Sequence, residues 1–273
     1  MIKNLGWPWP IEPQNSRAFL CLLTTPFILL AQVFFNMNQY RPGRELQFER
    51  IDPFPSAPGS EQIGLESPLR LNILEGIRVC PDRRSQVVLV STADQEHFVA
   101  KCFDPSLCPT DGAAEARQTV SEYCQARSRV EAEVYERLAQ FQGQYIPKFY
   151  GRYRYPGATA ILLEYIPNLS LDHFHDGLPE SELHELLDVG TTALNAIHEL
   201  GIFHYDIQAS NIFWSKETKA LRIVDWEFSR RDPPSDLVKD WAQSDLLEFR
   251  YALESCGLPK IPWQIPRGAT WYH

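Results

Sequence analysis

The most informative part of this chain is the run His204-Tyr205-Asp206-Ile207-Gln208-Ala209-Ser210-Asn211. It holds an Asp and, five positions later, an Asn, and the apolar run Ile223-Val224 ends downstream in a second acid, Asp225. One carboxylate can orient a hydroxyl group, while an amide oxygen and a second carboxylate can hold Mg²⁺ against the phosphates of a nucleotide. The spacing therefore predicts a site for a metal-bound nucleotide phosphate.

The surroundings of this run favour the same interpretation. A His-x-Asp-x-x-x-x-Asn match alone arises by chance in about one chain per hundred of this length. Here the match follows a helix predicted to end at Gly201, and a turn at 215–218 leads from it to the strand that ends in Asp225. The alternative, in which Asp206 and Asn211 only cap a turn in a loop, explains less of this pattern.

The chain before this run is rich in predicted strands, and the chain around it in predicted helices. Apolar periodicity predicts three antiparallel strands, one helix and two further strands; these cover residues 71–79, 86–91, 97–103, 128–140, 144–154 and 158–164. Beyond Asn168 a second helix is predicted, with Ser181 suited to its N-cap and Gly201 to its C-terminal stop. Two parts with a cleft between them follow from this order.

Two charged residues stand among apolar neighbours in the strand-rich part. Lys101 lies within the strand at 97–103, and Glu131 shares a helix face with Val134, Tyr135 and Leu138. A carboxylate in an apolar stripe needs a cation to offset its desolvation, so Lys101 is predicted to pair with Glu131. The alternatives are a Lys whose head reaches water and a structural Glu at the edge of the stripe. The neighbouring Glu133 is predicted to form an exposed helix pair with residue 137.

Between residues 70 and 245 the chain resembles the catalytic core of the protein-kinase-like superfamily. That resemblance implies roles for the five polar positions: Asp206 would orient or deprotonate the acceptor hydroxyl, Asn211 and Asp225 would bind Mg²⁺, and Lys101, steadied by Glu131, would contact the phosphates of ATP. The segment around Glu164 and Ile166 looks like the connection between the two halves of such a fold, whose backbone binds adenine. His204 would support the loop by hydrogen bonds.

The resemblance also implies an α+β, bilobal protein-kinase-like fold. Its N-lobe, a small antiparallel sheet with one helix, would cover residues 69–167, and a shortened, truncated helical C-lobe would cover 168–273. Residues 38–68 hold Pro42-Gly43 and Pro58-Gly59 among other prolines and are predicted to be an irregular linker. Residues 1–37 form a hydrophobic N-terminal segment.

Several departures set the chain apart from regulated protein kinases. It has no Gly-x-Gly-x-x-Gly before Lys101, and only Gly76 stands in the strand where such a motif would begin, with the expected loop at 81–85. Trp226-Glu227 follows Asp225 in place of Phe-Gly, Tyr205 takes the place of the usual Arg, there is no Ala-Pro-Glu motif, and 48 residues follow Asp225 (273 − 225). These features look closer to small atypical kinases and aminoglycoside-phosphotransferase-like enzymes.

The resemblance implies an ATP-dependent phosphotransferase that uses Mg²⁺ and moves the γ-phosphate to a hydroxyl of a protein or small molecule. The alternative is a pseudokinase that acts as a nucleotide-binding or protein-interaction module. Outside the five positions, Trp226, Trp241 and Trp263 are expected to be packing residues, and Asp240 is expected to anchor the Asp206 loop from a later helix.

Composition limits the partners. A net charge of −9 and a pI near 5.3 argue against nucleic acid. Six cysteines without a Cys-x-x-Cys pair indicate a reduced, cytoplasmic protein in which these side chains act as small hydrophobes.

Residues 18–35 approach the length of a membrane span, although Pro26 and Gln32 weaken that interpretation. A membrane anchor, a partner-binding strip and a segment absent from the working protein all remain open.

Overall fold

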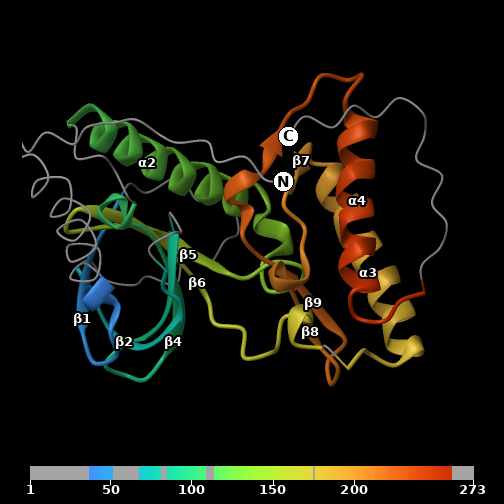
Figure 1. Cartoon of the computed structure of the whole chain (residues 1–273), viewed down its shortest axis with the longest axis horizontal. Helices are drawn as coiled ribbons and strands as arrows, with labels where there is room; N and C mark the ends of the chain where they lie inside the picture. Colours follow the sequence, from blue (N-terminus) through green and yellow to red (C-terminus); the bar gives the residue numbers. More distant parts are fainter. Residues whose placement is uncertain (1–36, 52–67, 81–84, 109–113, 175, 260–273) are drawn as a thin grey trace, which may run out of the picture.

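A closed antiparallel barrel forms one end of the molecule (Figure 1). The computed structural model describes residues 37–51, 68–80, 85–108, 114–174 and 176–259. The strands run in the order β1-β2-β3-β4-β6-β5, and the pairing of β1 with β5 closes the sheet. Their bounds are β1 (Glu45–Arg50), β2 (Leu69–Arg78), β3 (Ser85–Ser91), β4 (His97–Phe103), β5 (Phe149–Tyr155) and β6 (Ala158–Glu164). The three strands and the later pair predicted from the sequence are therefore confirmed as β2–β4, β5 and β6.

Strand β1 was not predicted. Residues 38–50 fall within the predicted irregular linker, and for them that prediction is wrong: the 3-10 helix η1 (Asn38–Tyr40) and β1 belong to the barrel. Inside the barrel Phe48 is 1% exposed and packs against the rings of Tyr153 and Tyr155. The prolines and glycines on either side hide the alternation of Leu46 and Phe48, which spans only one short strand. Residues 52–67 lie outside the described residues.

Helix α2 (Ala114–Arg137) packs across strands β5 and β6 (Figure 1). It begins well before the predicted start at 128, because its first half is mostly exposed and polar and carries no apolar stripe. It ends at Arg137, followed by η3 (Ala139–Phe141). The predicted apolar face is confirmed, since Val134, Tyr135 and Leu138 are fully buried.

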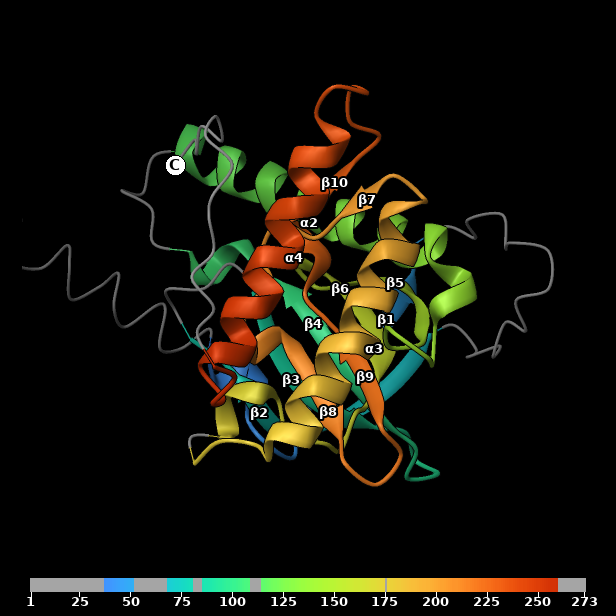
Figure 2. The same ribbon diagram turned by 90° about the vertical axis from the view of Figure 1, so that its right-hand side faces the viewer.

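Two antiparallel helices dominate the other end of the molecule. Figure 2 shows α3 (Glu180–His198) beside α4 (Val238–Glu254). Gly190 lets them approach closely, because a Cβ there would lie 2.0 Å from Cζ of Phe249. Helix α3 begins one residue before the expected Ser181 cap, with Pro179 at the N-cap position.

One short element, η2 (Pro105–Leu107), lies between β4 and α2. The other short elements precede α3 or lie between α3 and α4, where they carry the loop that contains Asp206: η4 (Leu171–His173), β7 (Ile202–Phe203), η5 (Ala209–Asn211), β8 (Ile212–Ser215), β9 (Ala220–Ile223), η6 (Trp226–Phe228) and β10 (Arg230–Arg231). The hairpin β8–β9 holds residues 211 and 225 at the same end, because Ile212 pairs with Ile223.

Within the described residues, the chain contains no helix that is both long and apolar enough to cross a membrane. The predicted hydrophobic segment at 18–35 lies outside them. Cys102 and Cys256 are buried as free thiols, in keeping with the predicted packing role.

Candidate functional site

Lys101 is buried at the centre of a group of acids. Its side chain is 4% exposed, and Nζ lies 2.7 Å from Oε2 of Glu131 and 3.1 Å from Oε2 of Glu227. It also contacts Oδ1 of Asp225. Burial alone would lower the pKa of Lys101, but the charges of Asp225, Glu131 and Glu227 outweigh it and raise the pKa above its usual range. The ammonium is therefore fixed among carboxylates and does not reach water.

Glu131 connects helix α2 to the segment after Asp225. Its carboxylate is fully buried, accepts the Lys101 bond through Oε2 and accepts the backbone N–H of Trp226 through Oε1 at 3.3 Å. Burial raises the pKa of Glu131 against the attraction of Lys101. The predicted pairing of residues 101 and 131 agrees with these contacts.

Asp225 follows strand β9 in a left-handed backbone conformation, with φ of 71°. A residue other than Gly in this region costs of order 1 kcal/mol, so the surrounding structure must hold it there. Oδ2 accepts two bonds from the guanidinium of Arg78, at 3.2 and 3.3 Å. Although burial opposes ionisation, Lys101 and Arg78 lower the pKa of Asp225 to about 2. The carboxylate is thus ionised and held by two cations.

The loop that carries Asp206 is supported by hydrogen bonds from within, as predicted for His204. The buried imidazole of His204 donates through Nε2 to the carbonyl of Val224 at 2.9 Å, which leaves Nδ1 to accept the backbone N–H of Asp206 at 3.2 Å. Asn211 donates through Nδ2 to the carbonyl of Asp206 at 3.0 Å. Burial raises the pKa of the Asp206 carboxyl, while His204 lowers it.

An acid that the sequence analysis missed, Asp245, anchors the same loop. The fully buried carboxylate of Asp245 accepts the backbone N–H groups of His204 and Tyr205 at 2.7 and 2.9 Å, and contacts Nε2 of His198 at 2.9 Å. The prediction that Asp240 anchors the loop is wrong, because Asp240 is exposed in the first turn of α4. The available signal was the placement of Asp245 four residues before the buried Phe249.

Glu248 makes a related contact one turn later in α4. Its Oε2 accepts the backbone N–H of Ile207 at 3.1 Å. Burial raises the pKa of Glu248 to about 7, helped by the charges of Asp245 and Asp206 and opposed by the bond from Ile207.

A cavity of about 530 Å³ lies between the barrel and the Asp206 loop. Lys101, Glu131, Asn211 and Asp225 line it, together with Glu164 and Ile166 of the predicted adenine-binding segment and apolar residues of β3 and β4. Asp206 is not among the lining residues, although its backbone is bonded to Asn211. A second hollow of about 770 Å³, between α2 and the edge of the barrel, contains none of the predicted site residues.

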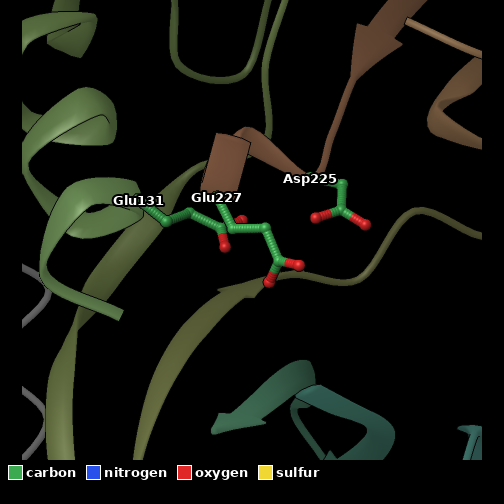
Figure 3. Close-up of side chains that lie close together, drawn as sticks. All are labelled: Glu131, Asp225 and Glu227. Atoms are coloured by element: carbon green, nitrogen blue, oxygen red, sulfur yellow. The ribbon is translucent and has the colours of Figure 1, made fainter. Parts of the chain in front are cut away.

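Three carboxylates in this cavity region face one another (Figure 3). They belong to Glu131 of α2, Asp225 after β9, and Glu227 of η6, and one oxygen of each lies within 4.8 Å of the others. Lys101 Nζ contacts all three, so these charges are already partly neutralised. For Mg²⁺, the predicted pair is Asn211 and Asp225. Carboxylate and amide oxygens suit that hard cation, and the bond from Nδ2 of Asn211 leaves its Oδ1 for a metal.

Ion pairs attach helix α2 to the chain that follows the site. The predicted pair of Glu133 with Arg137 is wrong: Glu133 contacts Arg231, and Arg137 forms two bonds with Asp232 at 2.7 and 2.8 Å. Contacts between distant segments replace the local helix pair, because α2 lies beside strand β10.

Aromatic and basic side chains surround Tyr205, the residue that replaces the usual Arg. Tyr205 has a φ of 64°, and the guanidinium of Arg230 lies 4.0 Å from the centre of its ring. Trp241 packs edge-on against the same ring, whereas Trp226 is fully buried. Both tryptophans are therefore packing residues as predicted, and Trp263 lies outside the described residues.

Comparison with known proteins gives the family. The family model "Protein kinase domain" matches residues 88–244, which is more than half of the chain, so the chain belongs to the protein kinase family. Among curated proteins, it is 30% identical over 109 residues to "Probable serine/threonine-protein kinase fnkB" of Dictyostelium discoideum, with 39% of this chain and 20% of that protein covered.

Two further relatives are similar over comparable stretches. "Serine/threonine-protein kinase 10" of Mus musculus is 30% identical over 124 residues, which cover 44% of this chain and 12% of that protein. "Meiotic driver SPOK2" of Podospora anserina is 26% identical over 110 residues, which cover 40% and 14%. The matches therefore span a fifth or less of the length of these relatives. The family model and these relatives bear out the resemblance to protein kinases, and the family model with the mixed helix and antiparallel-sheet content bears out an α+β kinase-like fold.

Proposed function

We propose that this chain is an ATP-dependent phosphotransferase that moves the γ-phosphate to a hydroxyl group with the help of Mg²⁺. The observation that carries the proposal is the contact of Lys101 with both Glu131 and Asp225 beside the 530 Å³ cavity. Three residues far apart in the sequence meet there with the charges that a nucleotide polyphosphate and its metal require. Family membership supports phosphotransfer in general.

In this proposal the two lobes hold the nucleotide between them. The N-lobe extends from residue 38 to 167, which adds η1 and β1 to the predicted range, and the C-lobe covers 168–273. Adenine lies against the segment of Glu164 and Ile166, and Lys101 contacts the phosphates. Asn211 and Asp225 hold Mg²⁺, which neutralises charge on the transferring group. Asp206 accepts the proton of the acceptor hydroxyl, and its raised pKa suits a base of moderate strength.

The acceptor is the hydroxyl of a protein or of a small molecule. The relatives named as serine/threonine-protein kinases favour a protein, whereas the departures from regulated kinases favour a small molecule. A panel of both classes, assayed with radiolabelled ATP, distinguishes them.

Binding is tested by thermal unfolding with ATP, with and without Mg²⁺. We expect ATP to raise Tm in a Mg²⁺-dependent way for the wild-type chain, and the Asp225→Asn variant to lose the Mg²⁺ dependence. Asp240→Asn is the matched control, since Asp240 is an exposed acid outside the cavity. A Tm that ATP leaves unchanged in the wild type would remove the proposal.

Transfer is tested separately with radiolabelled ATP and the variant Asp206→Asn. Loss of a general base typically lowers the rate by about 10²–10⁴-fold, so we expect phosphate transfer to fall by that order while ATP binding persists. Binding by the wild type without any transfer would instead support a second candidate function.

That candidate is a pseudokinase, a nucleotide-binding or protein-interaction module. One observation favours it: both oxygens of the Asp225 carboxylate are bonded to cations of the chain, Lys101 and Arg78, which compete with a metal.

A further inference from the structure

Arg78, to which the sequence analysis assigned no role, lines the cavity. It is the last residue of β2, its side chain is 34% exposed, and it lines the cavity next to Lys101. Both of its Nη atoms bond to Oδ2 of Asp225, at 3.2 and 3.3 Å. A cation at the end of β2, where the chain turns toward β3, is thus held within reach of the proposed phosphate site.

The guanidinium has donors that Asp225 does not use. Nε is buried and has no hydrogen-bond partner among the described residues, and the only other bond described for Nη2 is a long one of 3.5 Å to Oγ of Ser85. A guanidinium offers five N–H donors in a fork that fits phosphate oxygens. A buried N–H without an acceptor is costly, and phosphate oxygens in the cavity would supply one.

The backbone around Arg78 explains why a side chain is needed there. Without several glycines, backbone N–H groups cannot approach phosphates closely, and Gly76 is the only glycine of β2. The pairing of β2 with β3 shifts its register between Gly76 and Arg78. Charge leads to the same conclusion. Lys101 contacts three carboxylates, a polyphosphate adds further negative charge, and Arg78 is the second cation at this position.

We propose that Arg78 is a contact for the phosphates of the donor nucleotide and takes the place of the missing glycine-rich turn. When the nucleotide binds, Arg78 leaves Asp225 for phosphate oxygens, and Oδ2 of Asp225 becomes available to Mg²⁺. This inference rests on the proposed function, and it adds a specificity: the side chain recognises the phosphates and makes no contribution to the binding of the nucleoside.

The test compares the affinities of the full chain for adenosine, ADP and ATP with Mg²⁺, by calorimetry. For Arg78→Ala we expect ATP and ADP to bind about tenfold or more weakly than to the wild type, as for loss of a charge-assisted hydrogen bond, while adenosine binds equally well. Arg78→Lys keeps the charge without the fork, and we expect an intermediate loss. Arg70→Ala is the control, because Arg70 lies on the same strand but is exposed and pairs with Glu45.

Each outcome separates the two proposals. If the wild type binds none of the three ligands, the proposed function fails. If the wild type binds ATP and Arg78→Ala binds it equally well, the role of Arg78 is refuted while the proposed function stands. Tighter ATP binding by Arg78→Ala also refutes it, because Arg78 would then only block Asp225. Equal losses for adenosine and ATP in an Arg78→Ala variant whose unliganded Tm matches the wild type also refute it, because Arg78 would then support the whole cavity and not the phosphates. If that Tm is lower, Arg78→Lys, which keeps the charge, decides by the same comparison of adenosine with ATP.

Discussion

Single buried carboxylates organise the candidate site, and only some of them could be predicted. Glu131 was predictable because it stands in an apolar helical stripe and a lysine with the right strand context precedes it. Asp245 stands in a similar stripe, but its partners are backbone N–H groups of His204 and Tyr205. Every residue except proline carries a backbone N–H, so such a contact leaves almost no mark on the sequence of the partner. The proposed role of Arg78 could not be predicted either, since it depends on the direction in which the end of β2 points relative to the cavity.

At this scale we expect Asp245→Asn to destabilise the chain. The amide group would turn one N–H donor toward a backbone N–H, which leaves a buried donor unsatisfied at a cost of about 1–3 kcal/mol. Urea unfolding should therefore give a free energy of unfolding lower by about that amount. Asp240→Asn, on the exposed side of the same helix, should change it by less than about 0.5 kcal/mol. Equal values for both variants would contradict the anchoring role.

Elements were predictable where their apolar pattern was long enough. Strands β2, β3, β4 and β6 each carry a clear apolar run, and the sequence placed them within a few residues. The first half of α2 and the short strand β1 lack such a run, since one is polar and the other is flanked by turn residues. Their positions follow from contacts with distant strands, which local patterns do not encode.

We expect Phe48→Ala to reveal that β1 is part of the folded core. Removal of a fully buried aromatic ring costs about 3–5 kcal/mol, because Phe48 fills the barrel against Tyr153 and Tyr155. The free energy of unfolding by urea should fall by that amount. Gln47→Ala, at the exposed neighbouring position of the same strand, should leave it within about 0.5 kcal/mol. A similarly small effect of Phe48→Ala would contradict the assignment of β1 to the folded core.

For the whole molecule, the order of the motifs along the sequence predicted the family. The contacts among their side chains depend on the fold and are not visible in the sequence.

The distribution of charge adds a feature that composition did not reveal. Burial raises the pKa of Glu136 and of Glu248 to about 7, with help from the neighbouring acids Glu133 and Asp245 respectively. Folding therefore binds protons near neutral pH.

We expect the free energy of unfolding to fall as the pH rises from about 4.5 to about 7. In that range the unfolded chain ionises these glutamates while the folded chain keeps them protonated, so the folded state binds more protons and loses stability as protons are removed. Asp225, with a pKa lowered to about 2, adds stability that is lost only below about pH 4. Urea unfolding at several pH values measures the slope.

The variant Glu248→Gln identifies one source of this slope. A glutamine can still accept the N–H of Ile207 and does not ionise, so we expect a flatter dependence of stability on pH. Glu122→Gln, at an exposed position of α2, should leave the slope as in the wild type. An unchanged slope for Glu248→Gln would show that another group takes up the protons.

The closure of the sheet by β1 lowers the tendency of the protein to aggregate. A strand with an unpaired side is a template on which a neighbouring chain can polymerise. The pairing of Glu49 with Arg154 and of Arg50 with Tyr153 joins β1 to β5, so that the described strands of the sheet form a closed ring. Loss of that single short strand would bare β2 and β5 together. A lesion at residues 45–50, remote from the proposed chemistry, would therefore be harmful mainly by promoting fibrous or amorphous aggregates.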